Sequence, residues 1–378
     1  MAVKLGNGNW AVKENKLLAY NDNSGRFFNK EFDFSRGSSA TYVGKDGLIK
    51  SAASNVPRID FSDSTNGALL LEPQSTNLFP YSENLNGSGW INTGATITEN
   101  QSISPDGSLN ADLIELDSNL DRLAAVLGST GGTYTFSFYI KAKEGESGVW
   151  RTRVNGDSTL WQNTQVNDTE WTRVTQTFTK TGSGNIVVYP AYRVDGTSTL
   201  FNAYIYGAQV ELGSYATSYI PSLSGSATTR LADVCNNSGS AQDFNSEEGV
   251  LYAEIAALAN DSYRFFSLSD GSNSNNVRFN LSPTANQISF EVNSGGSLQL
   301  GYTNNSTDVL SNTKIAIKYK LNDFAVWING VEVNTDASGI TPTGLNTLNF
   351  DRGTGGNAFF GKTKNIQVFT EAKSDEFL

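Results

Sequence analysis

The chain has 378 residues, a length that suits two or three domains of ordinary size. It contains no histidine and a single cysteine, which excludes histidine-based catalytic triads, zinc sites with histidine ligands, disulfide frameworks and thiolate metal clusters. The net charge is −11 with only 17% charged residues, so we expect neither a nucleic acid nor an anionic membrane as a partner.

The first region, residues 1–78, is the least regular part of the sequence. It mixes turns rich in Asn and Gly, such as residues 21–25, with short apolar patches such as Leu69–Leu71. These segments are too few and too short to indicate a core of their own. We therefore predict an extended N-terminal docking region that lies either on the following domain or on a partner.

From residue 79 to residue 222 the pattern changes to strands separated by turn signals. The segment Thr133–Ala142 alternates aromatic and aliphatic residues with polar ones, which is typical of a strand with one buried face. Four more strands are predicted at Val149–Val154, Trp171–Thr179, Asn185–Tyr192 and Ala203–Leu212. Because no helical pattern separates these strands, we predict a two-sheet jelly roll.

A small polar segment, residues 223–243, is predicted to link this domain to a second sandwich at residues 244–378. The dipeptide Asn329-Gly330 lies between two apolar stretches, and both residues tolerate the positive φ angles of a type I′ hairpin turn. The predicted fold class is therefore all-β, with two tandem antiparallel sandwiches after the N-terminal region.

Several linear strings resemble parts of known proteins. Ser35–Lys50, Pro57–Phe61 and Leu69–Ser82 resemble a module common in tailed-bacteriophage virion proteins, and Gly207–Asp233 resembles the end of the carbohydrate-binding-type jelly roll that follows it. Residues 244–378 are similar to laminin-G or concanavalin A-like sandwiches.

The resemblance implies a bacteriophage appendage on the virion surface, either a head fibre or a tail fibre, that is made in the host cytoplasm. It also implies a homotrimer that contacts other virion proteins through its N-terminal region. Host-surface glycan is the implied ligand. Residues 1–33 lie outside the resemblance and would suit an attachment element.

Sugar binding needs an aromatic ring for the apolar face of a pyranose and polar groups for its hydroxyls. Trp161 is the first candidate, because the segment Asp157–Asn167 around it is polar and is predicted to be a loop. Trp150 and Tyr192 follow. Arg151 and Arg153 alternate on one strand and could bind an acidic sugar.

Enzymatic alternatives receive less support from the sequence. A hydrolase needs two nearby carboxylates, and Glu31 with Asp33 or Glu115 with Asp117 has the spacing of residues that share one face of a strand. A polysaccharide lyase could combine the two arginines of Val149–Val154 with Tyr189, Tyr192 and Arg193. We expect no enzyme activity. A polysaccharide-degrading tail spike and a purely structural capsid decoration stay open as alternatives.

No cofactor is expected. Two turns, Ser104–Gly107 and Asp270–Asn273, could supply calcium ligands, but neither has the ligand spacing of an EF-hand loop. Both are interpreted as ordinary turns, and Cys235 is expected to be an unpaired, unreactive thiol.

Overall fold

The structure is a computed structural model that describes residues 2–6, 10–21 and 26–375. Its regular elements in these residues are all β-strands, which confirms the predicted all-β fold class. The chain forms two compact units. Unit 1 contains residues 1–45, 52–73 and 232–378, and unit 2 contains residues 46–51 and 74–231. In the sequence, unit 2 is therefore inserted into unit 1.

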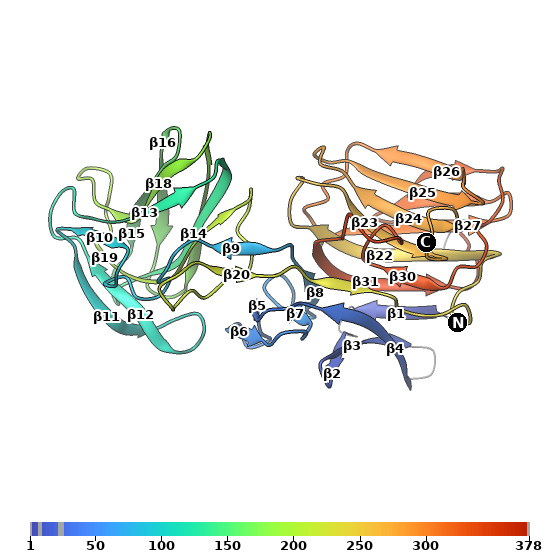
Figure 1. Ribbon diagram of the computed structural model, residues 1–378, viewed down its shortest axis with the longest axis horizontal. Helices are drawn as coiled ribbons and strands as arrows, with labels where there is room; N and C mark the ends of the chain where they lie inside the picture. The colour runs from blue at the N-terminus through green and yellow to red at the C-terminus, as the bar shows by residue number, and fades with distance from the viewer. Residues whose placement is uncertain (1, 7–9, 22–25, 376–378) are drawn as a thin grey trace. The chain divides into compact units, whose positions relative to one another are not determined.

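Unit 2 is an antiparallel sandwich of two five-stranded sheets (Figure 1). The first sheet has the order β10 (Trp90–Thr93), β13 (Arg122–Ser129), β18 (Gly184–Tyr192), β15 (Gly148–Asn155) and β16 (Thr159–Val166). The second has the order β11 (Thr96–Ile103), β12 (Leu109–Glu115), β19 (Asn202–Leu212), β14 (Gly132–Ala142) and β17 (Thr172–Lys180). A short pair, β9 (Ser75–Asn77) and β20 (Thr228–Arg230), completes this unit.

Strand alternation fills the core of unit 2 as the sequence predicts. Phe136, Phe138 and Ile140 of β14 are fully buried in the same cluster as Val188 and Trp150 of the facing sheet. In β15 the burial changes at every residue, so one row of side chains faces the core and the other row faces outward.

Unit 1 is also built from two main antiparallel sheets. The larger follows the order β21 (Val234–Asn236), β4 (Arg26–Ser35), β3 (Lys16–Asn21), β1 (Ala2–Gly6), β31 (Gly361–Phe369), β22 (Glu248–Ala257), β27 (Thr313–Lys320), β28 (Phe324–Ile328) and β29 (Val331–Asp336). Branches add β2 (Ala11–Lys13), β7 (Arg58–Asp60) and β8 (Ala68–Leu71). The smaller sheet has the order β26 (Ser297–Asn304), β25 (Ile288–Ser294), β24 (Asn276–Leu281), β23 (Arg264–Ser269) and β30 (Thr347–Asn349). A further strand of unit 1 is β5 (Ala40–Val43), while β6 (Ile49–Ala52) lies mostly within the residues of unit 2.

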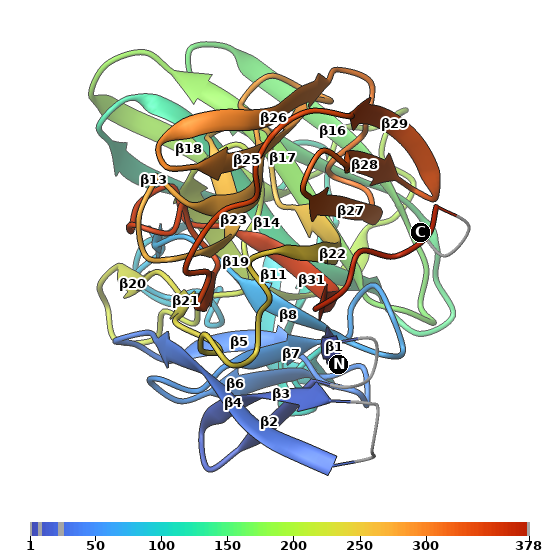
Figure 2. The same cartoon turned by 90° about the vertical axis from the view of Figure 1, so that its right-hand side faces the viewer.

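The N-terminal strands belong to the same sheet as the last strand of the chain. In this sheet β1 pairs with β31 from Ala2 opposite Phe369 onward, and β8 pairs with β31 through Leu71 opposite Gly361. Figure 2 shows the N-terminal strands in blue below β31 and β22. The predicted boundary after residue 78 therefore differs from the structure, in which residues 1–45 and 52–73 are part of unit 1. The hydrogen-bond partners are nearly the whole chain away, so no local sequence pattern indicates them.

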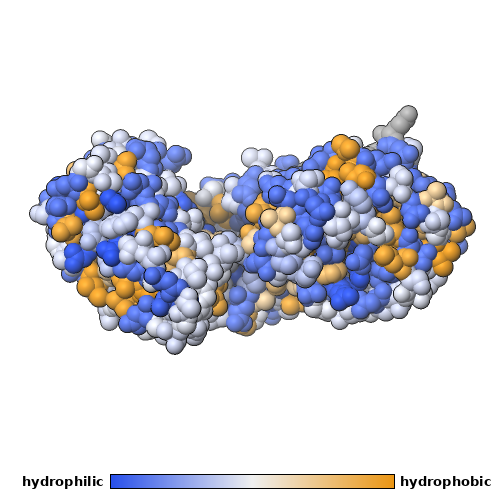
Figure 3. All heavy atoms as spheres, turned by 90° about the horizontal axis from the view of Figure 1, so that it is seen from above, coloured by the Kyte–Doolittle hydropathy of each residue, from blue (hydrophilic) through white to orange (hydrophobic). Residues whose placement is uncertain are grey.

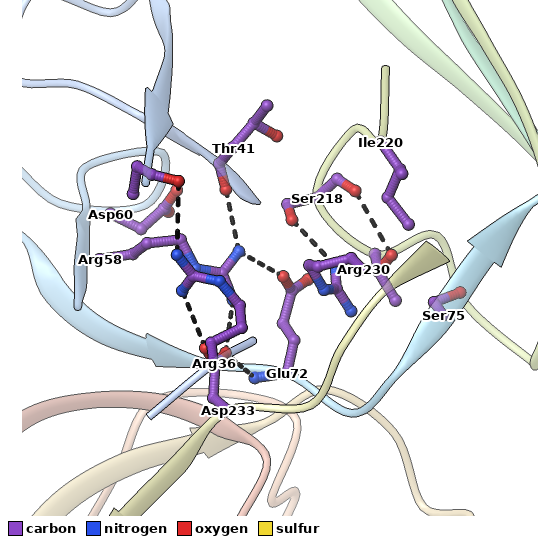
Figure 4. Close-up of polar contacts among 12 residues, drawn as sticks. Arg36, Thr41, Arg58, Asp60, Glu72, Ser75, Ser218, Ile220, Arg230 and Asp233 are labelled. Carbon is purple, nitrogen blue, oxygen red and sulfur yellow. Dashed lines mark hydrogen bonds and ion pairs between the residues drawn. The ribbon is translucent and has the colours of Figure 1, made fainter. Parts of the chain in front are cut away.

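A buried ionic cluster lies inside unit 1 (Figure 4). Asp233 contacts both Arg36, with Oδ1 3.0 Å from Nη1, and Arg58, with Oδ2 2.5 Å from Nη2. Glu72 pairs with Arg58 at 2.6 Å and donates its backbone N–H to Asp233 Oδ2. All four side chains are 0–3% exposed. The cluster thus holds two positive and two negative charges away from water.

The predicted hairpin at Asn329-Gly330 is confirmed. Ile328 pairs with Val331, and the two turn residues have φ angles of 52° and 79°. A Cβ added to Gly330 would meet no atom within 4 Å, so glycine is favoured here by its backbone conformation and not by space.

Exposed hydrophobic side chains are scattered over the surface. On the face drawn in Figure 3 they form separate small patches among hydrophilic residues. Among the described residues, no helix is long and apolar enough to cross a membrane.

Candidate functional site

Arginine and aromatic side chains gather on the outward face of the sheet β10-β13-β18-β15-β16. Arg151 and Arg153 come from the outward row of β15 and are half-buried. Trp161 of β16 stands directly opposite Arg153 in the strand register, and Tyr189 of β18 stands opposite it on the other side. The antiparallel pairing of three neighbouring strands therefore places these four side chains on one face.

The guanidinium groups lie over the aromatic rings. The Cζ atom of Arg151 is 4.2 Å from the centroid of the Trp161 ring, and that of Arg153 is 5.0 Å from the same centroid. The Cζ atom of Arg153 is also 5.0 Å from the Tyr189 ring. These distances are within the range of cation–π contacts, which hold a guanidinium in place without neutralising its charge.

Two more residues complete the group. The Tyr192 ring meets Trp161 edge-on, with centroids 5.0 Å apart, and lies 5.4 Å from Tyr189. Arg122 of β13 is paired with Tyr192 in the register, and its Cζ atom is 5.7 Å from that ring. We call the following six residues the arginine–aromatic cluster: Arg122, Arg151, Arg153, Trp161, Tyr189 and Tyr192.

Trp161 lies on a strand and not in the loop that the sequence predicts. The strand β16 is at the edge of its sheet, and most of its side chains are exposed or half-exposed. An edge strand without a buried face lacks apolar alternation, and this explains why a strand was not predicted. The Trp161 side chain is 40% exposed, so a ligand can reach part of it.

Trp150 does not belong to this surface. It is fully buried in the core of unit 2, and its indole N–H donates to the carbonyl oxygen of Pro190 at 2.7 Å. No ring face of Trp150 is open to a sugar, so the sequence prediction for this residue is corrected. The reason is the strand geometry, because Trp150 and Arg151 are neighbours and point to opposite sides of the sheet.

The three guanidiniums of the cluster have no carboxylate partner among the residues that the structure describes. In the described part of the chain, no acidic side chain lies within ion-pair distance of Arg122, Arg151 or Arg153. Arg193, which the sequence groups with them, is instead paired with Asp195 at 2.8 Å. Elsewhere, four more arginines have carboxylate partners: Arg36, Arg58, Arg264 and Arg278.

Sequence reasoning missed Arg122. It follows a turn and begins β13, about thirty residues before β15, and only the pairing of β13 with β18 brings it beside Tyr192. Only a prediction of the order of strands in this sheet could have assigned Arg122 to the site.

Three of the four carboxylates suggested for hydrolysis have partners within the chain. Glu31 pairs with Lys16 at 2.7 Å, and Asp33 accepts a hydrogen bond from the Asn237 side chain at 2.9 Å. Glu115 pairs with Lys143 at 2.8 Å.

Another acidic pair surrounds Tyr206. Its hydroxyl lies 3.0 Å from Asp106 Oδ2 and 3.4 Å from Glu83 Oε1. Burial raises the pKa of Glu83, and the charge of Asp106 adds to this rise. Burial opposes ionisation of Asp106 too, but hydrogen bonds from Ser108 N–H and the Ser104 hydroxyl outweigh it and lower the pKa of Asp106. In the first candidate calcium turn, Ser104–Gly107, the Asp106 carboxylate is therefore already engaged by hydrogen bonds from within the turn region.

In the second candidate calcium turn, Asp270–Asn273, the carboxylate is also engaged by hydrogen bonds. Asp270 accepts from the N–H of Ser272 at 2.8 Å and from the Asn275 side chain at 2.9 Å. Within residues 2–6, 10–21 and 26–375, no group of three or more Cys, Asp or Glu side chains is arranged to hold a metal ion.

Comparisons with known proteins give structural matches only. No family model and no curated protein matches the sequence. One similar solved structure is the CBM22-1 xylan-binding domain of Xyn10C from Paenibacillus barcinonensis, at 15% identity over 37% of this chain and 94% of that chain, with a TM-score of 0.27. The CBM22-1–CBM22-2 tandem of the same protein matches at 10% identity over 79% and 97%, with a TM-score of 0.28. Domains LG4-5 of the mouse laminin α1 chain match at 8% identity over 79% and 93%, with a TM-score of 0.25. We draw no functional conclusion from matches at these TM-scores.

Proposed function

We propose that this protein is a non-catalytic glycan-binding protein and that the arginine–aromatic cluster of unit 2 contacts the carbohydrate. The observation that carries the proposal is the presence of three aromatic rings and three guanidiniums on one outward sheet face. Aromatic edges and faces supply apolar contact to pyranose rings, while guanidinium N–H groups donate to their oxygens.

We further propose that the chain works as part of a bacteriophage appendage, either a head fibre or a tail fibre. The support is the sequence resemblance of Ser35–Lys50 and Leu69–Ser82 to virion proteins. In this proposal the chain forms a homotrimer and attaches to other virion proteins through its N-terminal strands, which belong to unit 1. Three copies of one weak glycan site would raise the avidity by about 10²–10⁴.

Glycan binding is tested with Trp161→Ala in the full chain. The residue is 40% exposed, so its loss should weaken binding on a bacterial glycan array and leave the unfolding temperature nearly unchanged. Tyr263→Ala is a matched control, because Tyr263 is an exposed aromatic residue of unit 1 with 52% exposure. Unchanged glycan binding in Trp161→Ala, or equal loss in both variants, would contradict the assignment of the surface.

The appendage role is tested on particles. Labelled antibody raised against the purified chain should bind intact virions at the head or at the tail, and light scattering should give the mass of a trimer. Virions without the chain that adsorb normally would favour the purely structural alternative. Release of reducing ends or unsaturated sugars from host polysaccharide would favour the tail-spike alternative.

A further inference from the structure

The arginine–aromatic cluster has the chemistry of an anion-binding surface. This inference rests on the proposed glycan function and concerns the class of glycan. We propose that the ligand is an acidic polysaccharide, whose carboxylate or sulfate groups pair with Arg122, Arg151 and Arg153.

The first argument is charge. The whole chain has 38 acidic and 27 basic residues, so carboxylates are abundant. Five other arginines are paired with a carboxylate, while among the described residues Arg173 and Arg352 are single arginines outside the cluster without one. The three guanidiniums of the cluster are paired with none among the described residues. A guanidinium stays protonated at all physiological pH values, so this face carries a fixed positive charge on a negatively charged protein. An anionic ligand supplies the missing partner.

The second argument concerns free donors. The Arg151 guanidinium makes no hydrogen bond in the described part of the chain, and its Nε atom is buried without a partner. Arg153 uses only Nε, which donates to Asn155 Oδ1 at 2.9 Å, and Arg122 uses only Nη1, which donates to the Leu120 carbonyl oxygen at 3.0 Å. The other terminal N–H groups of these arginines are left to bind the paired oxygens of a carboxylate or sulfate.

The third argument concerns the rings. Trp161 already has two guanidiniums at 4.2 and 5.0 Å from its centroid, so a neutral sugar that stacks on this ring must compete with both. The aromatic rings instead fix the positions of Arg151 and Arg153 before any ligand arrives. Such positioning reduces the conformational entropy that binding an anionic group would otherwise cost.

The experiment compares acidic polysaccharides with matched neutral forms. Full-length protein is titrated with polygalacturonate, alginate and hyaluronan, each beside its methyl-esterified form, and with dextran sulfate beside dextran. At least one acidic polymer should bind about tenfold or more tightly than its neutral partner, and added salt should weaken the binding. Preference for carboxylated or for sulfated polymers identifies the anion.

Two variants of equal charge change locate the site. Arg151→Gln should lose about tenfold or more in affinity for the acidic polymer. Arg352→Gln should change it less than twofold, because Arg352 is exposed in unit 1 and outside the cluster. If Arg151→Gln lowers the unfolding temperature, Arg122→Gln at the rim of the cluster replaces it in the comparison.

The possible failures are distinguishable. Equal or tighter binding of the neutral polymers overturns the acidic class while glycan recognition stands. An absence of binding to every acidic and neutral polymer, together with a negative glycan array, overturns the proposed function itself. Binding of duplex DNA that depends on Arg151 and exceeds that of all polysaccharides assigns the surface to nucleic acid and overturns the inference.

Discussion

The buried ionic cluster of unit 1 allows a quantitative prediction for Asp233→Asn. The substitution keeps the size of the side chain and removes one negative charge. Arg58 would keep its contact with Glu72, while both Arg36 and Arg58 would lose the carboxylate of Asp233 at positions that are 0–3% exposed.

Removal of one partner from a buried ion pair costs roughly 3–5 kcal/mol, because the remaining charge stays out of water. For a unit of this size, each kcal/mol lowers the midpoint by roughly 2–4 °C. We therefore expect the unfolding midpoint of unit 1 to fall by roughly 6–20 °C.

The assay is thermal unfolding, with hydrogen exchange of β22 and β31 peptides to assign the change to unit 1. Asp63→Asn is the matched control, because Asp63 also pairs with a cation, Lys362, but is 61% exposed. A surface pair contributes about 0–1 kcal/mol, so the control should shift the midpoint by less than about 4 °C. Equal shifts in the two variants would refute the reasoning from burial.

Four shorter predictions concern other parts of the chain. Trp150→Ala should destabilise unit 2 by about 3–5 kcal/mol in urea unfolding, because it empties a buried core position. Gly330→Ala should cost about 1 kcal/mol, since its φ of 79° suits glycine; a neutral effect would contradict the type I′ turn. Cys235 is buried and its thiol pKa is raised by burial, so a thiol reagent should modify it only after unfolding. Burial raises the pKa of Glu83, so the protonated side chain stabilises the fold at acidic pH and this stabilisation is lost as the pH rises through that pKa. The stability of Glu83→Gln should therefore increase relative to that of the parent between pH 4 and pH 8. A stability difference that does not change with pH would contradict this prediction.

Local alternation made five strands of unit 2 predictable, namely β14, β15, β17, β18 and β19, whereas β16 was missed. The predicted strand Thr133–Ala142 corresponds to β14 (Gly132–Ala142), and Asn185–Tyr192 corresponds to β18 (Gly184–Tyr192). Both strands bury one face in a common core, which imposes a period of two on the sequence itself. The placement of β1 and β8 in unit 1 was not predictable in this way, because it depends on pairing with β31, more than 280 residues later.

The candidate site was predictable only in part for a related reason. The alternation of β15 places Arg151 and Arg153 on one face, and that feature is readable from the sequence. The same alternation places Trp150 on the opposite face, so it could not have joined them. The contribution of Arg122 depends on the order of strands in the sheet, and a single sequence does not contain that order.

The discontinuous connectivity of unit 1 has a consequence for synthesis of the chain on the ribosome. Residues 74–231 supply nearly all of unit 2, so this unit can complete its sheets before residues 232–378 of unit 1 have been made. The early strands β1 and β8 must wait for β31, which is translated more than 280 residues after β8. Until then their unpaired edges are open to other strands, including those of neighbouring nascent chains. Truncation before Gly361 should consequently leave unit 2 folded and the N-terminal strands prone to aggregation.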